Sequence, residues 1–264
     1  MALDVPRPAR AGLAAGIHPV ESHIESGGTR VTFENKTAIE QVVIIEKMAW
    51  SDQAATAAQV TTLQTFQDLF SSEALRPMEQ IAVTNLTIMF ADLKSSTAMY
   101  HEVGDASAFG RVKDHFTVLR QCVSTHHGSI VKSIGDAVMA VFFDPAEGVA
   151  AALDMMQEIA TYNADNPSPP LCIKVGLHTG SCIAINQNDR LDYFGSTVNI
   201  AARIEDQSNG DEVVISESVM SDLGVKQFLA DSTRIATSCT AELKGLQELF
   251  PLYRIASRKK KEPE

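Results

Sequence analysis

The sequence lacks any long hydrophobic run, and no stretch approaches the roughly 18–20 apolar residues that a membrane-spanning helix needs. The opening segment MALDVPRPAR has no apolar core of a secretory signal, so we expect a cytoplasmic protein without a membrane span. Paired cysteine motifs are also missing. The four cysteines are scattered singly, which argues against a disulfide or zinc framework and predicts reduced, mostly buried thiols: Cys122, Cys172, Cys182 and Cys239.

Positive charge is scarce as well. The chain has 22 Lys and Arg against 33 Asp and Glu, a net charge of −11, which argues against broad nucleic-acid binding. A nucleotide substrate stays open, because magnesium and a few local cations can hold a triphosphate. The basic run at 258–261 is interpreted as part of a solvated, charged tail over 258–264. The 264 residues suffice for one sizeable domain and an appendage.

The N-terminal part of the chain divides into two segments. Residues 1–28 are rich in Pro, Ala and Gly and predict a flexible lead-in, or the remnant of a longer protein. Residues 29–78 predict a short β-hairpin, with strands at 30–35 and 41–50, and then a helix to residue 70. Two strands cannot bury a face alone, so they must pack on another part of the chain, a partner, or a missing β domain. The helix is either a packing helix or one that transmits a signal. Its apolar stripe is Ala54, Ala55, Ala58, Leu63, Phe66, Leu69 and Phe70.

From Ile81 onward, strand and helix patterns alternate, and we assign 79–257 to one domain. The predicted strands and loops indicate an α+β fold with helices over a largely antiparallel sheet. Strands are expected at 86–92, 171–180, 213–216 and 250–255, with a hairpin over 129–142 that turns at Ile134–Gly135. Helices are expected at 105–126, 146–161 and 195–208.

Three motifs carry the polar residues of interest. Asp92 follows an apolar strand, and Lys132 and Asp136 lie four residues apart across a tight turn. Further along, Asp192, Asn199 and Arg203 are spaced by seven and then four residues. Taken singly, Asp92 could cap a helix, Asp136 and Asp192 could be turn residues, and Lys132 could be a surface lysine.

Together and in this order, the motifs resemble the class III adenylate/guanylate cyclase catalytic domain, over about Ile81 to Ile255. The resemblance implies a ferredoxin-like core with additions. It also implies that Asp92, Asp136 and the backbone carbonyl of Leu93 bind two Mg²⁺ or Mn²⁺ ions per site. Two metal ions can activate the ribose 3′-OH and hold the leaving oxygens while it attacks the α-phosphorus, and hard cations prefer carboxylate oxygens.

The choice of base can be argued from hydrogen bonds. Adenine offers an acceptor at N1 and a donor at its 6-amino group, which match the donor Lys132 and the acceptor Asp192. Guanine reverses both edges and would leave mismatched polar groups at about 1–3 kcal/mol each. The resemblance agrees, since this pair marks adenylyl members, and it implies an adenylate cyclase that converts ATP to cyclic AMP.

Other residues contribute to the expected site. Asn199 and Arg203 lie one turn apart on a helix, where Asn199 can orient the ribose and Arg203 can stabilise charge at phosphorus. An ion pair of Arg203 with Glu205 or Asp206 is the competing interpretation. The resemblance places Lys244 on the triphosphate tail. After Asp92, free N–H groups at a helix start suit phosphate binding: Ser95, Ser96 and Thr97.

The remaining histidines and methionines are interpreted as structural. His178 is taken as a satisfied core histidine, not a general base, and His126–His127 as a helix end. Met139, Met155 and Met156 are taken as core residues.

In class III cyclases the metal carboxylates come from one protomer, and the base-selecting pair with the Asn and Arg comes from the other. Since this chain carries both sets, the resemblance implies a homodimer with two shared sites. It also leaves room for an upstream regulatory domain or protein. The alternatives are a catalytically silent nucleotide-sensing dimerisation module, which normally lacks a metal Asp or the Arg, and a guanylate cyclase.

Overall fold

The computed structural model of the chain describes most residues from 55 onward, namely 55–70, 75, 79–166, 169–188, 190–245 and 249–256. The predicted lead-in at 1–28, the hairpin strands at 30–35 and 41–50, and the tail at 258–264 lie outside the described residues.

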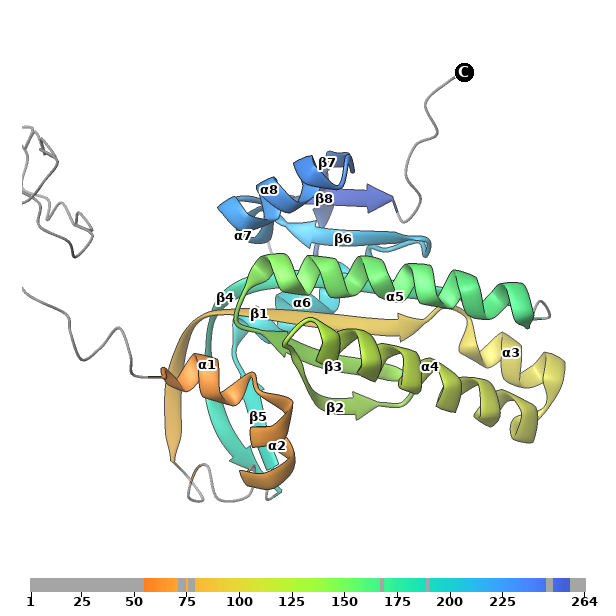
Figure 1. Ribbon diagram of the computed structural model, residues 1–264, viewed down its shortest axis with the longest axis horizontal. Helices are drawn as coiled ribbons and strands as arrows, with labels where there is room; N and C mark the ends of the chain where they lie inside the picture. The colour runs from red at the N-terminus through yellow and green to blue at the C-terminus, as the bar shows by residue number, and fades with distance from the viewer. Residues whose placement is uncertain are drawn as a thin grey trace, which may run out of the picture. The chain divides into compact units, whose positions relative to one another are not determined.

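A twisted eight-stranded sheet forms the centre of the described part, in the order β2-β3-β1-β4-β6-β8-β7, and β5 pairs only with β4 off this path (Figure 1). All pairs are antiparallel except the parallel pair β4–β6, which confirms the largely antiparallel sheet. The strands are β1 (Gln80–Leu93), β2 (Ser129–Ile134), β3 (Ala137–Phe142), β4 (Ile173–Gln187), β5 (Arg190–Phe194), β6 (Glu212–Ser216), β7 (Ala236–Glu242) and β8 (Leu249–Ala256).

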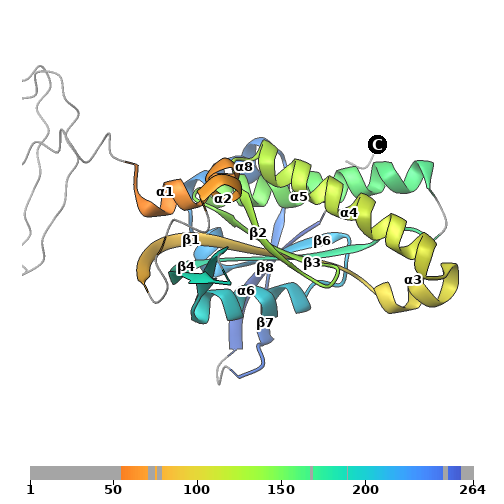
Figure 2. The ribbon, with the colours of Figure 1, turned by 90° about the horizontal axis from the view of Figure 1, so that it is seen from below.

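Helices cover both faces of this sheet. Figure 2 shows α4 and α5 on one side and α6 on the other. The helices are α1 (Ala57–Thr61), α2 (Gln64–Phe70), α3 (Ser96–Val103), α4 (Asp105–Thr125), α5 (Pro145–Asp165), α6 (Ser196–Asp206), α7 (Glu217–Met220) and α8 (Leu223–Asp231). None of the helices in the described ranges is long and apolar enough to span a bilayer.

Strand alternation explains the two-sided core. Along β1, Met89 and Ala91 belong to the cluster under α4 and α5, while Ile88 and Phe90 belong to the opposite cluster with α6. The side chain of Asp92 follows Phe90 by two residues, so it faces the α6 side of the sheet. This alternation decides on which face the candidate site is built.

Most expected elements are confirmed. The helices at 105–126, 146–161 and 195–208 correspond to α4, α5 and α6, and the hairpin turns at Gly135–Asp136, one residue later than predicted. The three methionines assigned to the core are buried, and all four cysteines are free: Met139, Met155 and Met156; Cys122, Cys172, Cys182 and Cys239.

The predicted continuous helix up to residue 70 is wrong. Within the described residues the segment forms two short helices, because the helix is interrupted between Thr61 and Gln64. Thr61 and Thr62 donate their hydroxyls to the carbonyls of Ala57 and Gln59, at 2.7 and 2.9 Å, which competes with helical continuation. The predicted apolar stripe is also mostly unburied, because only Ala58 of its described members is buried, and Leu63, Leu69 and Phe70 are exposed.

His126 fastens the end of α4 to α5. Its Nδ1 lies 2.9 Å from Glu147 Oε2, and its Nε2 lies 2.8 Å from Asp154 Oδ2. Burial alone would lower the pKa of His126, but the hydrogen bonds to Asp154 and Glu147 outweigh it and raise the pKa. The interpretation of His126 as a helix-end residue is confirmed, while its two carboxylate partners were missed.

This pair of contacts predicts a pH-dependent contribution to stability. Because the folded pKa lies above the unfolded value of about 6.5, the stabilisation is fully present below pH ~6.5 and is lost as pH rises through the folded pKa. We expect His126→Asn to lower the free energy of unfolding by about 1 kcal/mol at pH 6 and by less at pH 9. Urea unfolding at both pH values measures this difference.

His127→Asn is the matched control, since His127 is exposed and its positive φ of 55° suits asparagine. A loss of stability in His126→Asn that is equal at pH 6 and pH 9 would contradict the ionic origin of the contact.

Candidate active site

Two carboxylates meet where β1 ends and the β2–β3 hairpin turns. The β1–β3 register pairs Ala91 with Val138, so Asp92 lies beside the start of β3 and the turn residue Asp136. Burial raises the pKa of Asp92, and the negative charge of Asp136 raises it further. The two carboxylates are therefore close enough to repel each other, which confirms that the fold brings them together.

A histidine of α4 contacts the backbone of the turn residue Asp136. His115 Nε2, on the buried face of α4, lies 3.2 Å from the backbone carbonyl of Asp136. Burial lowers the pKa of His115 to about 4, so the ring is neutral and donates from Nε2. The Oδ2 atom of Asp136 is buried, and within the described residues it has no hydrogen-bond partner. His115 was missed in the sequence, where its place among the apolar positions of α4 was the available signal.

This donor set fits a hard divalent cation. Magnesium is commonly held by one or two carboxylates, with other oxygens from substrate and water. Asp136 raises the pKa of Asp92 by charge repulsion, and the buried Oδ2 of Asp136 has no hydrogen-bond partner among the described residues. A bound cation would offset the repulsion and would give that oxygen a partner. The described residues contain no cluster of three or more His, Cys, Asp or Glu side chains suited to a metal, so the protein offers these two carboxylates.

A lysine missed in the sequence moderates the charge of Asp92. Lys174 is the register partner of Asp92 on β4, and its Nζ lies 2.6 Å from Glu205 Oε1 and 4.0 Å from Asp206 Oδ1. Burial would lower the pKa of Lys174, but its hydrogen bond to Glu205 and nearby acidic charges raise it. Glu205 therefore pairs with Lys174, and the competing interpretation of Glu205 as the ion-pair partner of Arg203 is wrong.

The loop after Asp92 turns sharply into α3. Ser95 adopts a left-handed conformation with φ of 60°, and its side chain does not cap the helix. The backbone carbonyl of Ser95 accepts from the N–H groups of Ala98 and Met99. Because the Ser95 side chain makes no cap hydrogen bond, it leaves the N–H groups of Ser96 and Thr97 uncapped at the positive end of α3. Leu93, Lys94, Ser95 and Ser96 line one side of a cavity of about 150 Å³ here.

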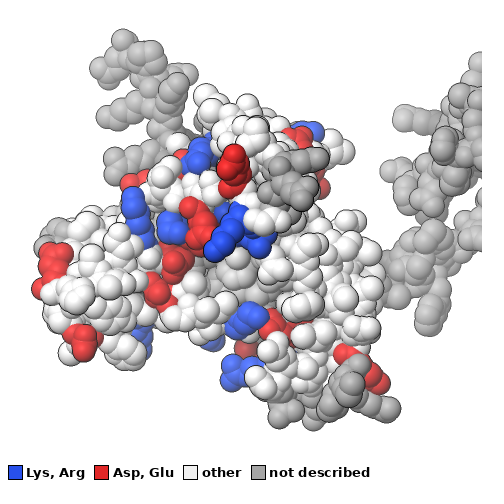
Figure 3. Space-filling view, turned by 180° about the vertical axis from the view of Figure 1, so that it is seen from behind, with Lys and Arg blue, Asp and Glu red and all other residues white. Residues whose placement is uncertain are grey.

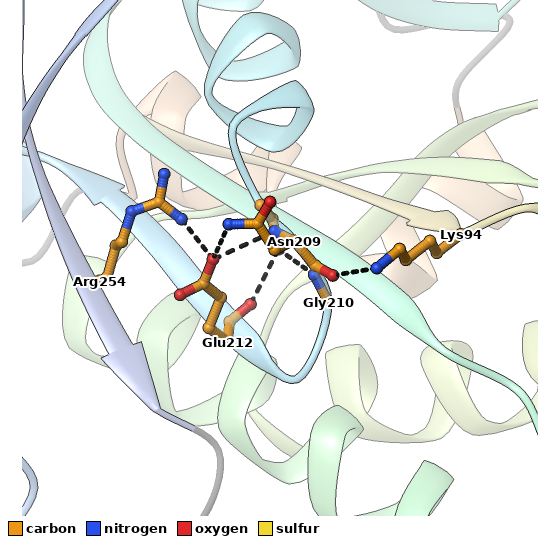
Figure 4. A network of polar contacts seen from close by, with 6 residues as sticks. Lys94, Asn209, Gly210, Glu212 and Arg254 are labelled. Atoms are coloured by element: carbon orange, nitrogen blue, oxygen red, sulfur yellow. Dashed lines mark hydrogen bonds and ion pairs between the residues drawn. The ribbon is translucent and has the colours of Figure 1, made fainter.

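Lys94 anchors this loop to the turn between α6 and β6 (Figure 4). Its Nζ donates to the carbonyl of Asn209 at 2.6 Å, and the backbone N–H of Asn209 donates to Glu212 Oε1 at 3.1 Å. Glu212 also forms an ion pair with Arg254 of β8. This network holds the loop in place. The Lys94 ammonium is used in it, because it donates to the Asn209 carbonyl.

The predicted base-reading residues are brought together within this one chain. Lys132 Nζ donates to Asp192 Oδ2 at 2.5 Å. The other carboxylate oxygen, Oδ1, accepts the backbone N–H of Tyr193 at 2.8 Å. Asp192, on β5, is buried, and Lys132, on β2, is half-buried. Lys132 is therefore not a free surface lysine, and Asp192 is a strand residue and not a turn residue, as the alternative interpretation had them.

Asn199 and Arg203 both lie on α6, as predicted, with Asn199 exposed and Arg203 half-buried. Helix α6 approaches the sheet closely because β4 has glycine at Gly176, where a Cβ would lie 2.2 Å from the backbone nitrogen of Glu205. The Arg203 guanidinium packs against Gly245, the neighbour of the exposed Lys244. A Cβ added at Gly245 would lie 3.5–3.8 Å from the guanidinium atoms. The structure thus places Arg203 and the Lys244 turn side by side.

The face that carries α6 is turned away in Figure 1. Figure 3 shows basic and acidic side chains lying next to one another near the centre of this face. Among the described residues, the charges that shift the pKa of Asp92 come from Asp136, Lys174 and Asp206. Lys132, Asp192 and Arg203 are not among them. One chain therefore presents two groups of residues, the carboxylates at the β1 end and the β2–β3 turn, and the Lys132–Asp192 pair that joins β2 to β5.

His178 is confirmed as a structural histidine. Its Nδ1 lies 2.9 Å from Ser216 Oγ, and burial lowers its pKa to about 4. Its ring also makes an edge contact with Phe250, with ring centroids 5.9 Å apart. Ser218 Oγ of α7 lies 3.2 Å from the same Nδ1, so the ring is held by hydroxyl and aromatic neighbours.

Comparisons with known proteins agree with this arrangement. Residues 78–250 match the family model described as the adenylate and guanylate cyclase catalytic domain. An adenylate cyclase of Anabaena cylindrica is 27% identical over 185 residues, which cover 64% of this chain and 36% of that protein. Human retinal guanylyl cyclase 1 is 26% identical over 189 residues, covering 66% of this chain and 17% of that protein. The chain thus spans about a third or less of the length of these relatives.

Among solved structures, the adenylyl cyclase CyaB from P. aeruginosa superposes with a TM-score of 0.59 at 22% identity. The match covers 70% of this chain and all of that one. The α+β fold described above is therefore the fold of these catalytic domains.

Proposed function

The chain belongs to the family of adenylate and guanylate cyclase catalytic domains, and from that premise we propose that it is an adenylate cyclase, converting ATP to cyclic AMP and pyrophosphate. The observation that carries this proposal is the Lys132–Asp192 pair at 2.5 Å. A lysine donor and a carboxylate acceptor match N1 and the 6-amino group of adenine. With guanine the lysine donor would face another donor, and the carboxylate acceptor would face another acceptor.

Asp92 and Asp136, with the carbonyl of Leu93, would hold Mg²⁺ or Mn²⁺, two ions per site. Bound metal supplies activation of the ribose 3′-OH and stabilisation of the leaving pyrophosphate. The mutual repulsion of the two carboxylates and the unpartnered Oδ2 of Asp136 support this role. His115 then acts by holding the Asp136 turn.

The remaining residues position the substrate and stabilise charge. Arg203 offers a permanently cationic fork for the charge that develops at phosphorus, and no ion pair occupies it within the described part of the chain. Asn199, one turn earlier, orients the ribose. Lys244, which lies beside Arg203, contacts the triphosphate. At the start of α3, the segment Ser95, Ser96 and Thr97 binds phosphate, with the uncapped backbone N–H groups of Ser96 and Thr97 donating to phosphate oxygens.

The working enzyme is proposed to be a homodimer with two shared active sites. The carboxylates and the base-reading group are both complete in this chain, with Asp92 at the end of β1 and the Lys132–Asp192 pair between β2 and β5. A partner chain placed against this face would supply the second group to the first. A catalytically silent dimer is disfavoured because neither carboxylate nor the arginine is missing.

Nucleotide preference tests this function. The purified protein should turn over ATP at least ~10-fold better than GTP, which corresponds to about 1.4 kcal/mol. The physical reason is the donor–acceptor match of Lys132 and Asp192 with adenine. The measurement is product identification and kcat/KM with each nucleotide supplied separately, under magnesium and under manganese.

The double variant Lys132→Glu with Asp192→Cys should reduce this preference together with the rate, because both matched groups are removed. Faster turnover of GTP than of ATP by the unmodified protein would show a guanylate cyclase and overturn the assignment of the base. No turnover of either nucleotide would favour the silent module.

A further inference from the structure

Helices α1 and α2 lie against the two strands that carry Lys132 and Asp192 (Figure 1). Ala58 of α1 belongs to the same buried cluster as Val131 and Leu191, the residues that directly precede the base-reading pair in the sequence. Tyr193, which directly follows Asp192, belongs to this cluster as well. The helices therefore share a core with both ends of the Lys132–Asp192 contact.

Two hydrogen bonds join the helices to these strands. The backbone N–H of Ile130 donates to Gln64 Oε1 at 2.8 Å, two residues before Lys132. The hydroxyl of Tyr193 donates to the backbone carbonyl of Thr61 at 3.2 Å. Tyr193 is also the residue whose backbone N–H binds Asp192 Oδ1. Each strand of the pair is thus attached to the helices within two residues of its functional side chain.

The sheet itself does not fix the distance between these strands. Strand β2 is at one end of the sheet order, and β5 pairs only with β4, so no ladder joins β2 to β5. The ladder of β2 is also irregular between Ile130 and Lys132. Besides the Lys132–Asp192 contact itself, helices α1 and α2 supply hydrogen bonds to both strands.

We propose that Gln64 and Tyr193 are positioning residues that hold Lys132 and Asp192 at the spacing needed to read the base. The placement of α1–α2 then sets the affinity and selectivity for the nucleotide, so a change in the segment before β1 reaches the active site through these two bonds. The inference rests on the proposed function, since it assigns regulation to the same site. The expected signature is a change in KM and in the ATP/GTP ratio, with a smaller change in kcat.

The test uses the full chain and two variants, Tyr193→Phe and Gln64→Leu. Tyr193→Phe removes only the hydroxyl, and the Thr61 carbonyl keeps its 2.9 Å bond from Gln67 Nε2, so the variant should fold. Gln64→Leu keeps the size of the side chain and removes the acceptor for Ile130. Each should raise the KM for ATP by about 3- to 10-fold and lower the ATP/GTP preference by a similar factor.

Two matched variants separate positioning from general packing. Gln64→Glu keeps a side-chain oxygen that accepts the Ile130 N–H and should restore most of the affinity. Leu69→Ala changes an exposed residue of the same helix and should leave both parameters unchanged. Hydrogen exchange should be faster over 129–134 and 190–194 in Tyr193→Phe and Gln64→Leu than in the unmodified chain.

An unmodified protein that prefers ATP, together with a Tyr193→Phe variant of unchanged KM and unchanged selectivity, would overturn the positioning role and leave the proposed function intact. Loss of affinity in Leu69→Ala equal to that in Gln64→Leu would also overturn it, because the effect would then be general. An unmodified protein that turns over neither nucleotide would remove the proposed function itself.

Discussion

Asp92→Asn should lower cyclic AMP formation at least ~100-fold, a loss of about 2.7 kcal/mol of transition-state stabilisation. The substitution keeps the shape of the side chain and removes the charge that a divalent cation needs. Asp136→Asn should behave in the same way, because the two carboxylates lie close enough to raise the pKa of Asp92. The measurement is the initial rate of product formation at saturating Mg²⁺ and ATP.

The stability of this variant distinguishes a functional loss from a folding defect. Since burial and Asp136 raise the pKa of Asp92, its ionised form destabilises the folded state at neutral pH. Asp92→Asn should therefore melt at the same temperature as the unmodified protein or higher. Asp165→Asn, at the exposed end of α5, is the matched control and should leave both rate and stability unchanged. Near-normal turnover by Asp92→Asn with magnesium would rule out the two-carboxylate site.

Mixing two inactive proteins, Asp92→Ala and Arg203→Ala, should restore activity. Each homodimer lacks one essential group in both of its sites. In a mixed dimer one site takes both defects, and the other takes none. That intact site combines Asp92 and Asp136 of the Arg203→Ala chain with Arg203 and the Lys132–Asp192 pair of the Asp92→Ala chain.

Activity should reach up to about half of the unmodified level per mixed dimer, if the two sites are independent. It should peak near equal amounts of the two proteins when the mixing ratio is varied. Subunit exchange is verified separately with differently tagged chains. A flat and inactive response despite proven exchange would mean that both groups serve the site of the same protomer, and the shared-site dimer would be abandoned.

The sequence was informative where a short-range pattern has one physical meaning. The apolar periodicity of 105–126 specified α4, because an apolar face at helical spacing must be buried, and the helix expected at 146–161 corresponds to α5. Asn199 and Arg203 were placed on one helix by their spacing alone. The resemblance added the pairing of Lys132 with Asp192, which the structure brings to 2.5 Å although 60 residues separate them.

The sequence was uninformative where a residue's role depends on a distant neighbour. Lys174 and Glu205 look like ordinary surface charges, yet the β1–β4 register sets Lys174 opposite Asp92, and α6 brings Glu205 to it. His115 is one polar residue on an apolar helix face, and only the fold places it at the Asp136 carbonyl. The break between α1 and α2 follows from hydroxyl hydrogen bonds that compete with a helix of good apolar pattern.

By itself, then, the sequence determined the order of the main elements, most of the buried face of α4, and the residue types of the site, because these follow from local periodicity and motif spacing. The tertiary structure decided which charges neighbour Asp92, which side chains hold the Asp136 turn, and how α1 and α2 attach to β2 and β5. These depend on strand register and helix approach, which are set by the packing of the whole core and not by any local stretch of chain.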